Sequence, residues 1–312
     1  MWTSTLTRYL ARVPGLPELL GPVARRLASE SVLSSKVRGA IGGACATNLA
    51  LPGYVRSFST TIAGAEITMA AKPRVSLVGL AYYRGLADFE PTTVALFAAL
   101  ARHARVIVDV GANAGIFSLL AARLRPEARI LAFEPNPLVA MSLARSVALS
   151  GARGVEVLPT ALGTKIGYST LFTTVSDVLT SLDGARVPDA VELTVPVTTL
   201  DAVLKERNVV GVDLIKVDVE GWELPVFEGA AETLARDRPV VIFEALADAP
   251  AQAIDELFTK LRYEIRVVMP GSLRKVTLAS TSGAGAAPER NFVAIPVERL
   301  AAVLEAAGAP RD

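Results

Sequence analysis

The segment Val108-Asp109-Val110-Gly111-Ala112-Asn113-Ala114-Gly115 joins the apolar run Val106–Val110 to a second apolar run, Ile116–Leu124. This order predicts a strand that ends in a glycine-bearing loop and is followed by a helix. Gly111 can adopt backbone angles that residues with a Cβ resist, so the loop can turn sharply beside a ligand. Gly115 allows the helix to start close to the strand. In open α/β sheets, ligands bind outside the carboxyl ends of the strands.

The same alternation of short apolar runs and helices continues along the chain. Strand, helix and strand with short connections predict a doubly wound, Rossmann-like α/β sheet, mostly parallel and with the last strand antiparallel. An irregular or hairpin-like β excursion is expected between Thr160 and Pro196, and a loop over Ala279–Pro288. We expect strands at Val106–Val110, Arg129–Phe133, Val155–Leu158, Val212–Val219, Pro239–Glu244, Tyr263–Val268 and Phe292–Ile295, and helices at Pro91–His103, Ile116–Leu124, Leu138–Leu149, Leu200–Arg207, Glu223–Ala235 and Ala251–Leu261.

The N-terminal part differs from the rest. Residues 1–53 are expected to form a helical extension with a basic face, either packed on the main domain or in peripheral contact with a membrane. Residues 54–312 are expected to form one domain that begins with a small β-hairpin segment, residues 54–83. The β-prone runs of that segment are Val55–Ile62, Glu66–Met69 and Val75–Leu80.

Composition excludes several classes of function. The chain has 312 residues and a formal net charge of +1, which gives no electrostatic argument for nucleic-acid binding. The single cysteine, Cys45, excludes an intramolecular disulfide and a cysteine-based zinc site. With His103 as the single histidine, histidine-based catalytic pairs and metal clusters are disfavoured. We find no apolar window of transmembrane length and no secretory signal, and expect a cytoplasmic protein.

The glycine loop invites comparison with a dinucleotide-binding loop, whose pattern is G-x-G-x-x-G. Here Asn113 stands where the middle glycine would let the backbone approach a pyrophosphate. A ligand without a pyrophosphate therefore fits better. S-adenosylmethionine is such a ligand, and its cationic groups favour the nearby carboxylate of Asp109. The alternative interpretation is an ordinary strand-to-helix turn.

A second motif, Phe133-Glu134-Pro135-Asn136, lies at the end of the next strand. An acidic residue about twenty positions after the glycine loop can accept hydrogen bonds from both ribose hydroxyls. This feature serves NAD and S-adenosylmethionine alike, so it supports an adenosyl ligand without separating the two. Asn136 is also a candidate N-cap for the following helix.

The third motif is Asp213-Leu214-Ile215-Lys216-Val217-Asp218-Val219-Glu220-Gly221-Trp222-Glu223. A central parallel strand is normally apolar throughout, yet strand alternation puts Lys216, Asp218 and Glu220 on one face here. A buried charge is costly unless it is paired, so we expect Lys216 to neutralise a neighbouring carboxylate. Such a pair is either structural or part of the catalytic machinery.

With these three motifs in order, the chain resembles the FkbM family of methyltransferases. The resemblance runs from about Tyr82 to Glu244 and includes Ala161-Leu162-Gly163 and Thr198-Thr199-Leu200-Asp201. It implies S-adenosylmethionine as cofactor and, for most members, O-methylation of sugars, polyketides or glycan units. Residues 54–312 are then a methyltransferase domain.

The resemblance also implies cofactor-binding residues. It puts Asp109, Gly111, Asn113 and Gly115 around the methionine portion, Glu134 on the ribose and Ala161 near the adenine. Glu90 resembles the acidic residue that these proteins carry ahead of the first strand. The remaining motif positions predicted to bind the cofactor are Ala112, Pro135 and Asn136.

Methyl transfer to a hydroxyl benefits from a base that takes the hydroxyl proton. Asp218 is the first candidate, Glu220 and Glu244 are the next, and Lys216 completes the predicted catalytic set. These carboxylates would alternatively bind a divalent cation, but nothing in their spacing demands one, so no metal is predicted. The predicted function is O-methylation of a hydroxyl on a small molecule, sugar or lipid-linked glycan. The alternatives are an NAD-dependent oxidoreductase and a non-catalytic Rossmann-like binding protein.

Overall fold

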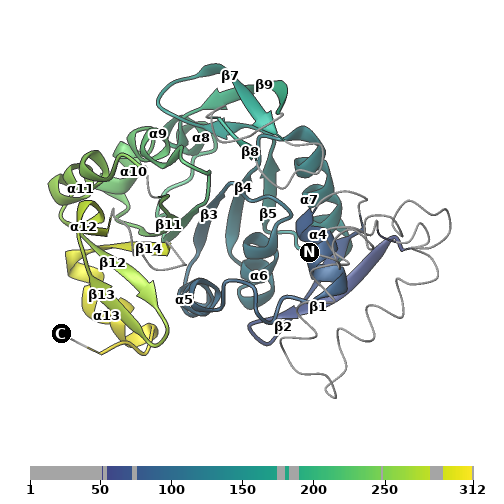
Figure 1. Ribbon diagram of the computed structural model, residues 1–312, viewed down its shortest axis with the longest axis horizontal. Helices are drawn as coiled ribbons and strands as arrows, with labels where there is room; N and C mark the ends of the chain where they lie inside the picture. The colour runs from purple at the N-terminus through teal and green to yellow at the C-terminus, as the bar shows by residue number, and fades with distance from the viewer. Residues whose placement is uncertain are drawn as a thin grey trace, which may run out of the picture.

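The computed structural model describes residues 51, 55–71, 76–173, 180–182, 190–246, 249–281 and 291–310. Its centre is an eight-stranded sheet of order β13-β12-β14-β11-β10-β3-β4-β5 (Figure 1). The strands are β3 (Val106–Val110), β4 (Arg129–Phe133), β5 (Val155–Leu158), β10 (Leu214–Val217), β11 (Val240–Glu244), β12 (Tyr263–Met269), β13 (Ser272–Lys275) and β14 (Asn291–Pro296).

The sheet topology confirms the predicted fold class. Strands β5, β4, β3, β10 and β11 pair in parallel, whereas β14 pairs antiparallel with both β11 and β12. The chain runs outward from β3 through β4 to β5 and then returns to place β10 on the other side of β3. This reversal of strand order beside β3 is the place where open α/β sheets bind ligands.

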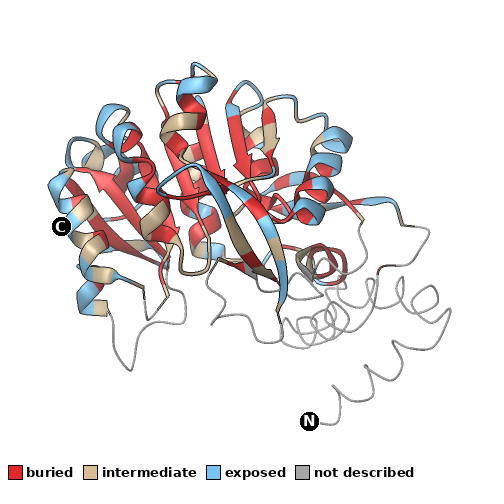
Figure 2. Cartoon of the chain, turned by 90° about the horizontal axis from the view of Figure 1, so that it is seen from above, coloured by how far each residue is buried: buried red, intermediate tan, exposed pale blue. Residues whose placement is uncertain are grey.

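Two apolar cores, one on each face, hold the sheet between layers of helices, and Figure 2 shows the buried strands between these layers. One core contains side chains from α5 (Pro91–Ala101), α6 (Ile116–Leu124), α7 (Pro137–Ser150) and α13 (Leu300–Ala306). The other contains side chains from α8 (Leu200–Glu206), α9 (Glu223–Glu228), α10 (Ala231–Arg236), α11 (Ala251–Lys260) and α12 (Leu278–Thr281). A short 3₁₀ helix, η2 (Val297–Arg299), precedes α13.

Two smaller β structures lie outside the main sheet. The predicted hairpin is present as β1 (Ser57–Ile62) and β2 (Ala65–Ala70), and the backbone N–H of Ala70 donates to the hydroxyl of Ser146 on α7 at 2.9 Å. The predicted β excursion forms a four-stranded sheet of order β6-β9-β7-β8. Its strands are β6 (Ala161–Leu162), β7 (Gly167–Thr173), β8 (Thr180–Ser181) and β9 (Val191–Thr198).

Three local predictions were wrong. The run Val75–Leu80 was expected as a strand, but α4 (Ser76–Tyr83) is a helix, because a short apolar run buried by its surroundings carries no decisive period. The helix expected over Glu223–Ala235 is divided into α9 and α10. At the division, a Cβ on Gly229 would lie 2.0 Å from the backbone oxygen of Gly163. The strand expected over Val212–Val219 is only the four residues of β10.

Other predictions fall wholly or partly outside the described residues. The helical extension over residues 1–53 lies outside them except for Leu51. Of the expected loop Ala279–Pro288, the first residues belong to α12 and residues 282–290 are outside the described part of the chain. Within the described residues, no helix is both long enough and apolar enough to span a membrane.

Candidate active site

The loop after β3 is packed between the ends of two neighbouring strands. The backbone N–H groups of Gly111 and Ala112 both donate to the carbonyl oxygen of Phe133 at the end of β4, each at 2.9 Å. Gly111 has a φ of 76°, and a Cβ on it would lie 1.9 Å from the backbone oxygen of Asp218, just after β10. The glycine is therefore required both by its backbone angle and by the close approach of the two chain segments.

The rest of the loop is built for close contact as well. Gly115 has a φ of 86° as the N-cap of α6, where a Cβ would lie 2.1 Å from Cδ1 of Leu143. Asn113 also has a positive φ, 47°. Its side-chain Oδ1 is buried and has no hydrogen-bond donor among the described residues. A buried acceptor without a donor is unusual, and a bound ligand is one of its ordinary explanations.

Glu134 ties this loop to β4. Its carboxylate accepts from the backbone N–H of Asn113 at 2.9 Å and from that of Asn136 at 2.8 Å, and the residue is 5% exposed. An ionised carboxylate is purely an acceptor, so Glu134 is the kind of group to which ligand hydroxyls donate. Asn136 accepts from the N–H of Leu138 at 3.0 Å, which confirms it as the N-cap of α7.

Lys216 is the most deeply buried charge of the site. It is 0% exposed and lies directly beside Asp109 in the parallel register of β10 and β3. Its Nζ lies 3.3 Å from Oδ2 of Asp218 and 5.2 Å from the centre of the Phe117 ring. The predicted pairing of Lys216 with a carboxylate is therefore confirmed. The Asp218 side chain keeps 28% exposure, so it is the member of the pair that a ligand can reach.

Several carboxylates surround the Lys216 ammonium and keep it charged. Burial acts to lower the pKa of Lys216, but the negative charges of Asp218, Glu90, Asp109 and Glu244 outweigh it and raise the pKa above its ordinary value. Glu90 is the N-cap of α5, with a φ of 37°. Its charge thus acts on Lys216, while the cofactor-binding role expected for Glu90 stays a prediction.

Asp109, at the end of β3, is held away from solvent. The hydroxyl of Ser118 on α6 donates to its Oδ2 at 2.5 Å, and the residue is buried. Burial raises the pKa of Asp109 to about 6, even though the Ser118 hydrogen bond and the charge of Lys216 act to lower it. Ser118 was not among the site residues predicted from the sequence. Its position one turn into the helix after the glycine loop was the available signal.

Glu244 ends β11, one strand beyond Lys216. Burial, and then the charge of Asp218, raise the pKa of Glu244 to about 8, while Lys216 acts to lower it and Glu220 and Glu90 act to raise it. Glu220 does not continue the strand face as expected, because β10 ends at Val217 and Glu220 has a φ of 51°. The hydroxyl of Ser181 on β8 donates to the backbone oxygen of Glu220 at 2.9 Å.

The Glu244 carboxyl predicts a dependence of stability on pH. Its pKa of about 8 in the folded chain exceeds the ordinary value of 4.5, so the folded state holds this proton more tightly than the unfolded state. The stabilisation is complete below about pH 4.5 and is lost as the pH rises through 8. We expect Glu244→Gln to flatten this decline in urea unfolding measured at pH 5 and pH 8. The exposed Glu256→Gln is the control, and an unchanged decline in Glu244→Gln would contradict the assignment.

Ala161 and Gly163 lie beside β9 in the smaller sheet. Ala161 is buried in β6, where it pairs with Val197, and its predicted contact with adenine stays a prediction. A Cβ on Gly163 would lie 3.5 Å from Nε1 of Trp222. That Nε1 atom is buried and has no acceptor among the described residues. Trp222 belongs to the third motif, but no role was predicted for it from the sequence.

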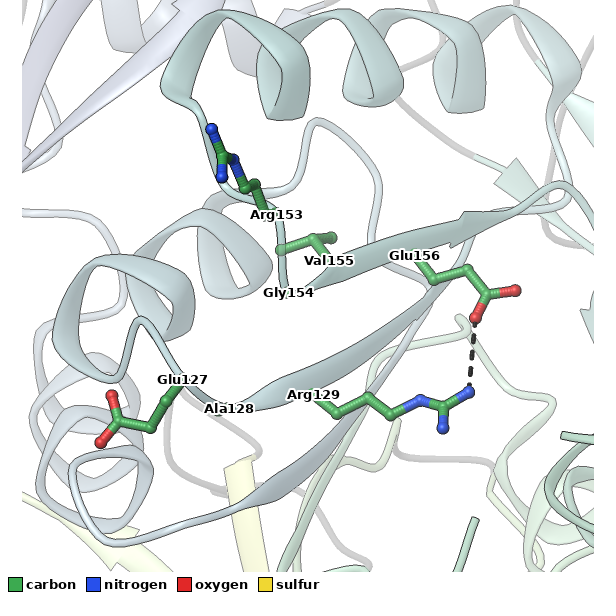
Figure 3. A pocket seen from close by; sticks show the side chains of 7 residues that line it. All are labelled: Glu127, Ala128, Arg129, Arg153, Gly154, Val155 and Glu156. Carbon is green, nitrogen blue, oxygen red and sulfur yellow. Dashed lines mark ion pairs between the residues drawn. The ribbon is translucent and has the colours of Figure 1, made fainter. Parts of the chain in front are cut away.

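The described residues do not form a metal centre here, and a cavity that they line lies elsewhere on the sheet. Among the described residues, no group of three or more His, Cys, Asp and Glu side chains is placed to hold a metal ion. A cavity of about 280 Å³ is lined by Arg129, Arg153, Gly154 and their neighbours (Figure 3). The cavity lies at the amino ends of β4 and β5, whereas the glycine loop follows the carboxyl end of β3. It therefore takes no part in the site.

Comparison with known proteins assigns the family. A profile of the methyltransferase FkbM domain matches residues 109–266. The chain belongs to the FkbM methyltransferase family. "Methyltransferase sdnD" of Sordaria araneosa is 35% identical over 156 residues, which are 40% of this chain and 60% of that protein. "Methyltransferase 1" of Beauveria bassiana (strain ARSEF 2860) is 33% identical over 142 residues, 39% of this chain and 57% of that protein. The FkbM chain thus spans about three fifths of the length of these curated relatives.

Two solved structures with a partial likeness to this FkbM chain carry the following descriptions. A methyltransferase FkbM from Methylobacillus flagellatus KT aligns with a TM-score of 0.39 and 14% identity, covering 71% of this chain and 54% of that one. A precorrin-6y C5,15-methyltransferase from Geobacter metallireducens GS-15 aligns with a TM-score of 0.39 and 15% identity, covering 66% and 88%.

Membership in the FkbM family implies S-adenosylmethionine as the cofactor, as the sequence predicted. The residues present fit this molecule. Oδ1 of Asn113 is a buried acceptor without a donor among the described residues, and the amino group of the methionine part is a donor that would suit it. Glu134 is a buried carboxylate bonded to the same loop, and such an acceptor suits ribose hydroxyls.

Proposed function

We propose that this FkbM chain transfers the methyl group of S-adenosylmethionine to a hydroxyl oxygen of a small molecule, a sugar or a lipid-linked glycan. The observation that carries the proposal is the Lys216–Asp218 pair, which adjoins the glycine loop through the contact between Gly111 and the backbone oxygen of Asp218. A partly exposed carboxylate thereby lies next to the residues that fit the cofactor. The near-neutral chain, with a formal charge of +1, favours such acceptors over nucleic acid.

Each residue has a defined part in this proposal. When bound, S-adenosylmethionine supplies a methyl group on a positively charged sulfur, so the acceptor needs only an oxygen held in line and relieved of its proton. Glu134 and Asn113 bind the adenosyl and methionine parts. Asp218 takes the proton of the acceptor hydroxyl, a contribution typically worth about 10²–10⁴ in rate. Lys216 donates to Asp218 and holds the carboxylate in place.

Calorimetry with S-adenosylmethionine and with NAD tests the cofactor half of the proposal. We expect micromolar binding of S-adenosylmethionine, no signal with NAD, and at least a tenfold weaker affinity in Glu134→Ala, about 1.4 kcal/mol, because ribose hydroxyls lose a charged acceptor. Glu156→Ala is the matched control, because Glu156 lies near the amino end of β5, away from the glycine loop. Binding of NAD, or of neither molecule, would overturn the proposal.

Transfer of a tritiated methyl group to a set of hydroxyl and amine acceptors tests the other half. We expect labelling of hydroxyl acceptors, and we expect Asp218→Asn to lose about 10²-fold or more in kcat while it still binds S-adenosylmethionine. Labelling of amines alone would replace O-methylation by N-methylation. An unchanged kcat in Asp218→Asn would remove Asp218 as the base.

A further inference from the structure

Asn291 is the first residue of β14, and the sheet places it beside Glu244. The two residues are partners in the antiparallel register of β11 and β14. Side chains of directly opposed residues lie on the same face of a sheet, with Cβ atoms about 4.5–5.5 Å apart. In Figure 1, β14 lies between β12 and β11.

This face is the one that carries Lys216. Alternation along β11 puts Glu244 on the same side as Ile242, which is the register partner of Lys216. Alternation along β14 puts Asn291 on the same side as Val293, and Val293 packs in the same core as Ile242. The same face of the sheet therefore carries Lys216 and Asp218 at β10, Glu244 on the neighbouring strand β11 and Asn291 on the next strand, β14.

The Asn291 side chain is buried without its full set of hydrogen bonds. The residue is 4% exposed, and its Oδ1 has no donor among the described residues. Most buried side-chain acceptors in folded proteins have a partner. An apolar side chain of similar size would fill this place without leaving an acceptor unsatisfied. The Oδ1 atom of Asn291 therefore suits a ligand that brings a donor.

We propose that Asn291 and Glu244 bind the acceptor, with Oδ1 of Asn291 accepting a hydrogen bond from a second hydroxyl next to the one that reacts at Asp218. This inference rests on the proposed function and adds to it the residues that select the acceptor. Neighbouring strands lie about 4.8 Å apart, so Glu244 is one strand and Asn291 two strands from Asp218. A molecule with hydroxyls on neighbouring or nearby carbons matches this spacing, whereas one with a single hydroxyl leaves Oδ1 of Asn291 unsatisfied.

The test compares acceptors that differ by one hydroxyl. Methyl α-glucopyranoside, methyl α-rhamnopyranoside, myo-inositol and their mono-deoxy analogues serve as probes, with tritiated S-adenosylmethionine as methyl donor. For the wild-type chain, we expect one deoxy analogue to be methylated with a KM at least about tenfold higher than its parent, because a site built to bond a hydroxyl rejects the analogue without it. In Asn291→Leu, the parent and that analogue should have the same high KM, with kcat little changed.

Two measurements separate this role from a structural one. Calorimetry should show unchanged binding of S-adenosylmethionine in Asn291→Leu, and its Tm should equal or exceed that of the wild type. Gln252→Leu, an exposed amide on α11, is the matched control, and Asn291→Ala replaces Asn291→Leu if the larger side chain prevents folding.

The outcomes are distinct. Retained discrimination between parent and deoxy acceptor in the variant overturns the inference but leaves the proposed function intact. A lower Tm together with parallel losses of cofactor binding and kcat assigns Asn291 a structural role and also overturns the inference. Methylation of none of these probes by a wild-type chain that binds S-adenosylmethionine overturns this acceptor assignment, whereas failure to bind S-adenosylmethionine overturns the proposed function itself.

Discussion

Replacing Gly111 by alanine is expected to reduce the affinity for S-adenosylmethionine at least about 100-fold, or about 2.7 kcal/mol, and to destabilise the fold. The new Cβ would lie 1.9 Å from the backbone oxygen of Asp218 and 2.9 Å from its carbonyl carbon. Neither atom belongs to a flexible side chain, so relief requires the loop after β3 and the segment after β10 to separate. That separation moves the cofactor loop away from the carboxylate of Asp218.

A second glycine isolates the effect of this contact. Gly151, the C-cap of α7, has a φ of 63°, but no atom lies within 4 Å of its Cβ position. Gly151→Ala therefore carries only the cost of a positive φ, about 1–2 kcal/mol. Calorimetry should show normal cofactor binding in Gly151→Ala and none measurable in Gly111→Ala. Equal behaviour of the two variants would show that backbone angle, and not close approach, explains Gly111.

Lys216→Met is expected to lower the free energy of unfolding by about 3–5 kcal/mol, because it leaves buried carboxylates without a compensating charge. Lys216 acts to lower the pKa of both Asp109 and Glu244. Without Lys216, the pKa values of Asp109 and Glu244 rise further, so the folded variant holds both protons more tightly. The variant is therefore least destabilised at a pH at which both carboxyl groups are protonated. The deficit should be smaller at pH 5 than at pH 8 in urea unfolding.

Another lysine pair is the control for Lys216→Met. Nζ of Lys275 lies 2.6 Å from Glu264, but its side chain is 65% exposed. Exposed pairs contribute about 0–1 kcal/mol, so Lys275→Met should have a small effect with little dependence on pH. The double variant Lys216→Met with Asp218→Asn should recover part of the loss. If Lys216→Met lowers the free energy of unfolding no more than Lys275→Met does, the Lys216 ammonium is not the group that compensates the neighbouring carboxylates.

Much of the fold was predictable because local patterns determine it. The strands β3, β4 and β5 have the predicted bounds, since each is a short apolar run between turn residues and alternates with a helix. The same pattern predicted that loops after parallel strands meet at one edge. Glu134 and the glycine loop do meet there, joined by the hydrogen bond from the backbone of Asn113. The FkbM resemblance, carried by these same motifs, was confirmed by the family match.

The buried charge in an apolar strand was also predictable from the sequence. Lys216 interrupts β10, and the cost of burying it without a partner predicted its pairing with a carboxylate. The pattern did not show how many carboxylates share that ammonium. Glu90 lies between α4 and α5, ahead of β3, and Glu244 ends β11, so their effect on Lys216 depends on the folded arrangement of distant segments.

The amino-acid sequence alone was enough to predict the succession of strands and helices, the glycine loop, the acidic residue after β4 and the need for a partner to Lys216. These follow from backbone sterics, hydrophobic period and the cost of desolvating a charge, all of which act within short stretches. Only the tertiary structure decided that α4 is a helix, that Glu220 leaves the strand face, and that Asn291 stands beside Glu244. Each of these depends on which distant segment covers or pairs with the residue, because strand register and burial are properties of two segments and not of one.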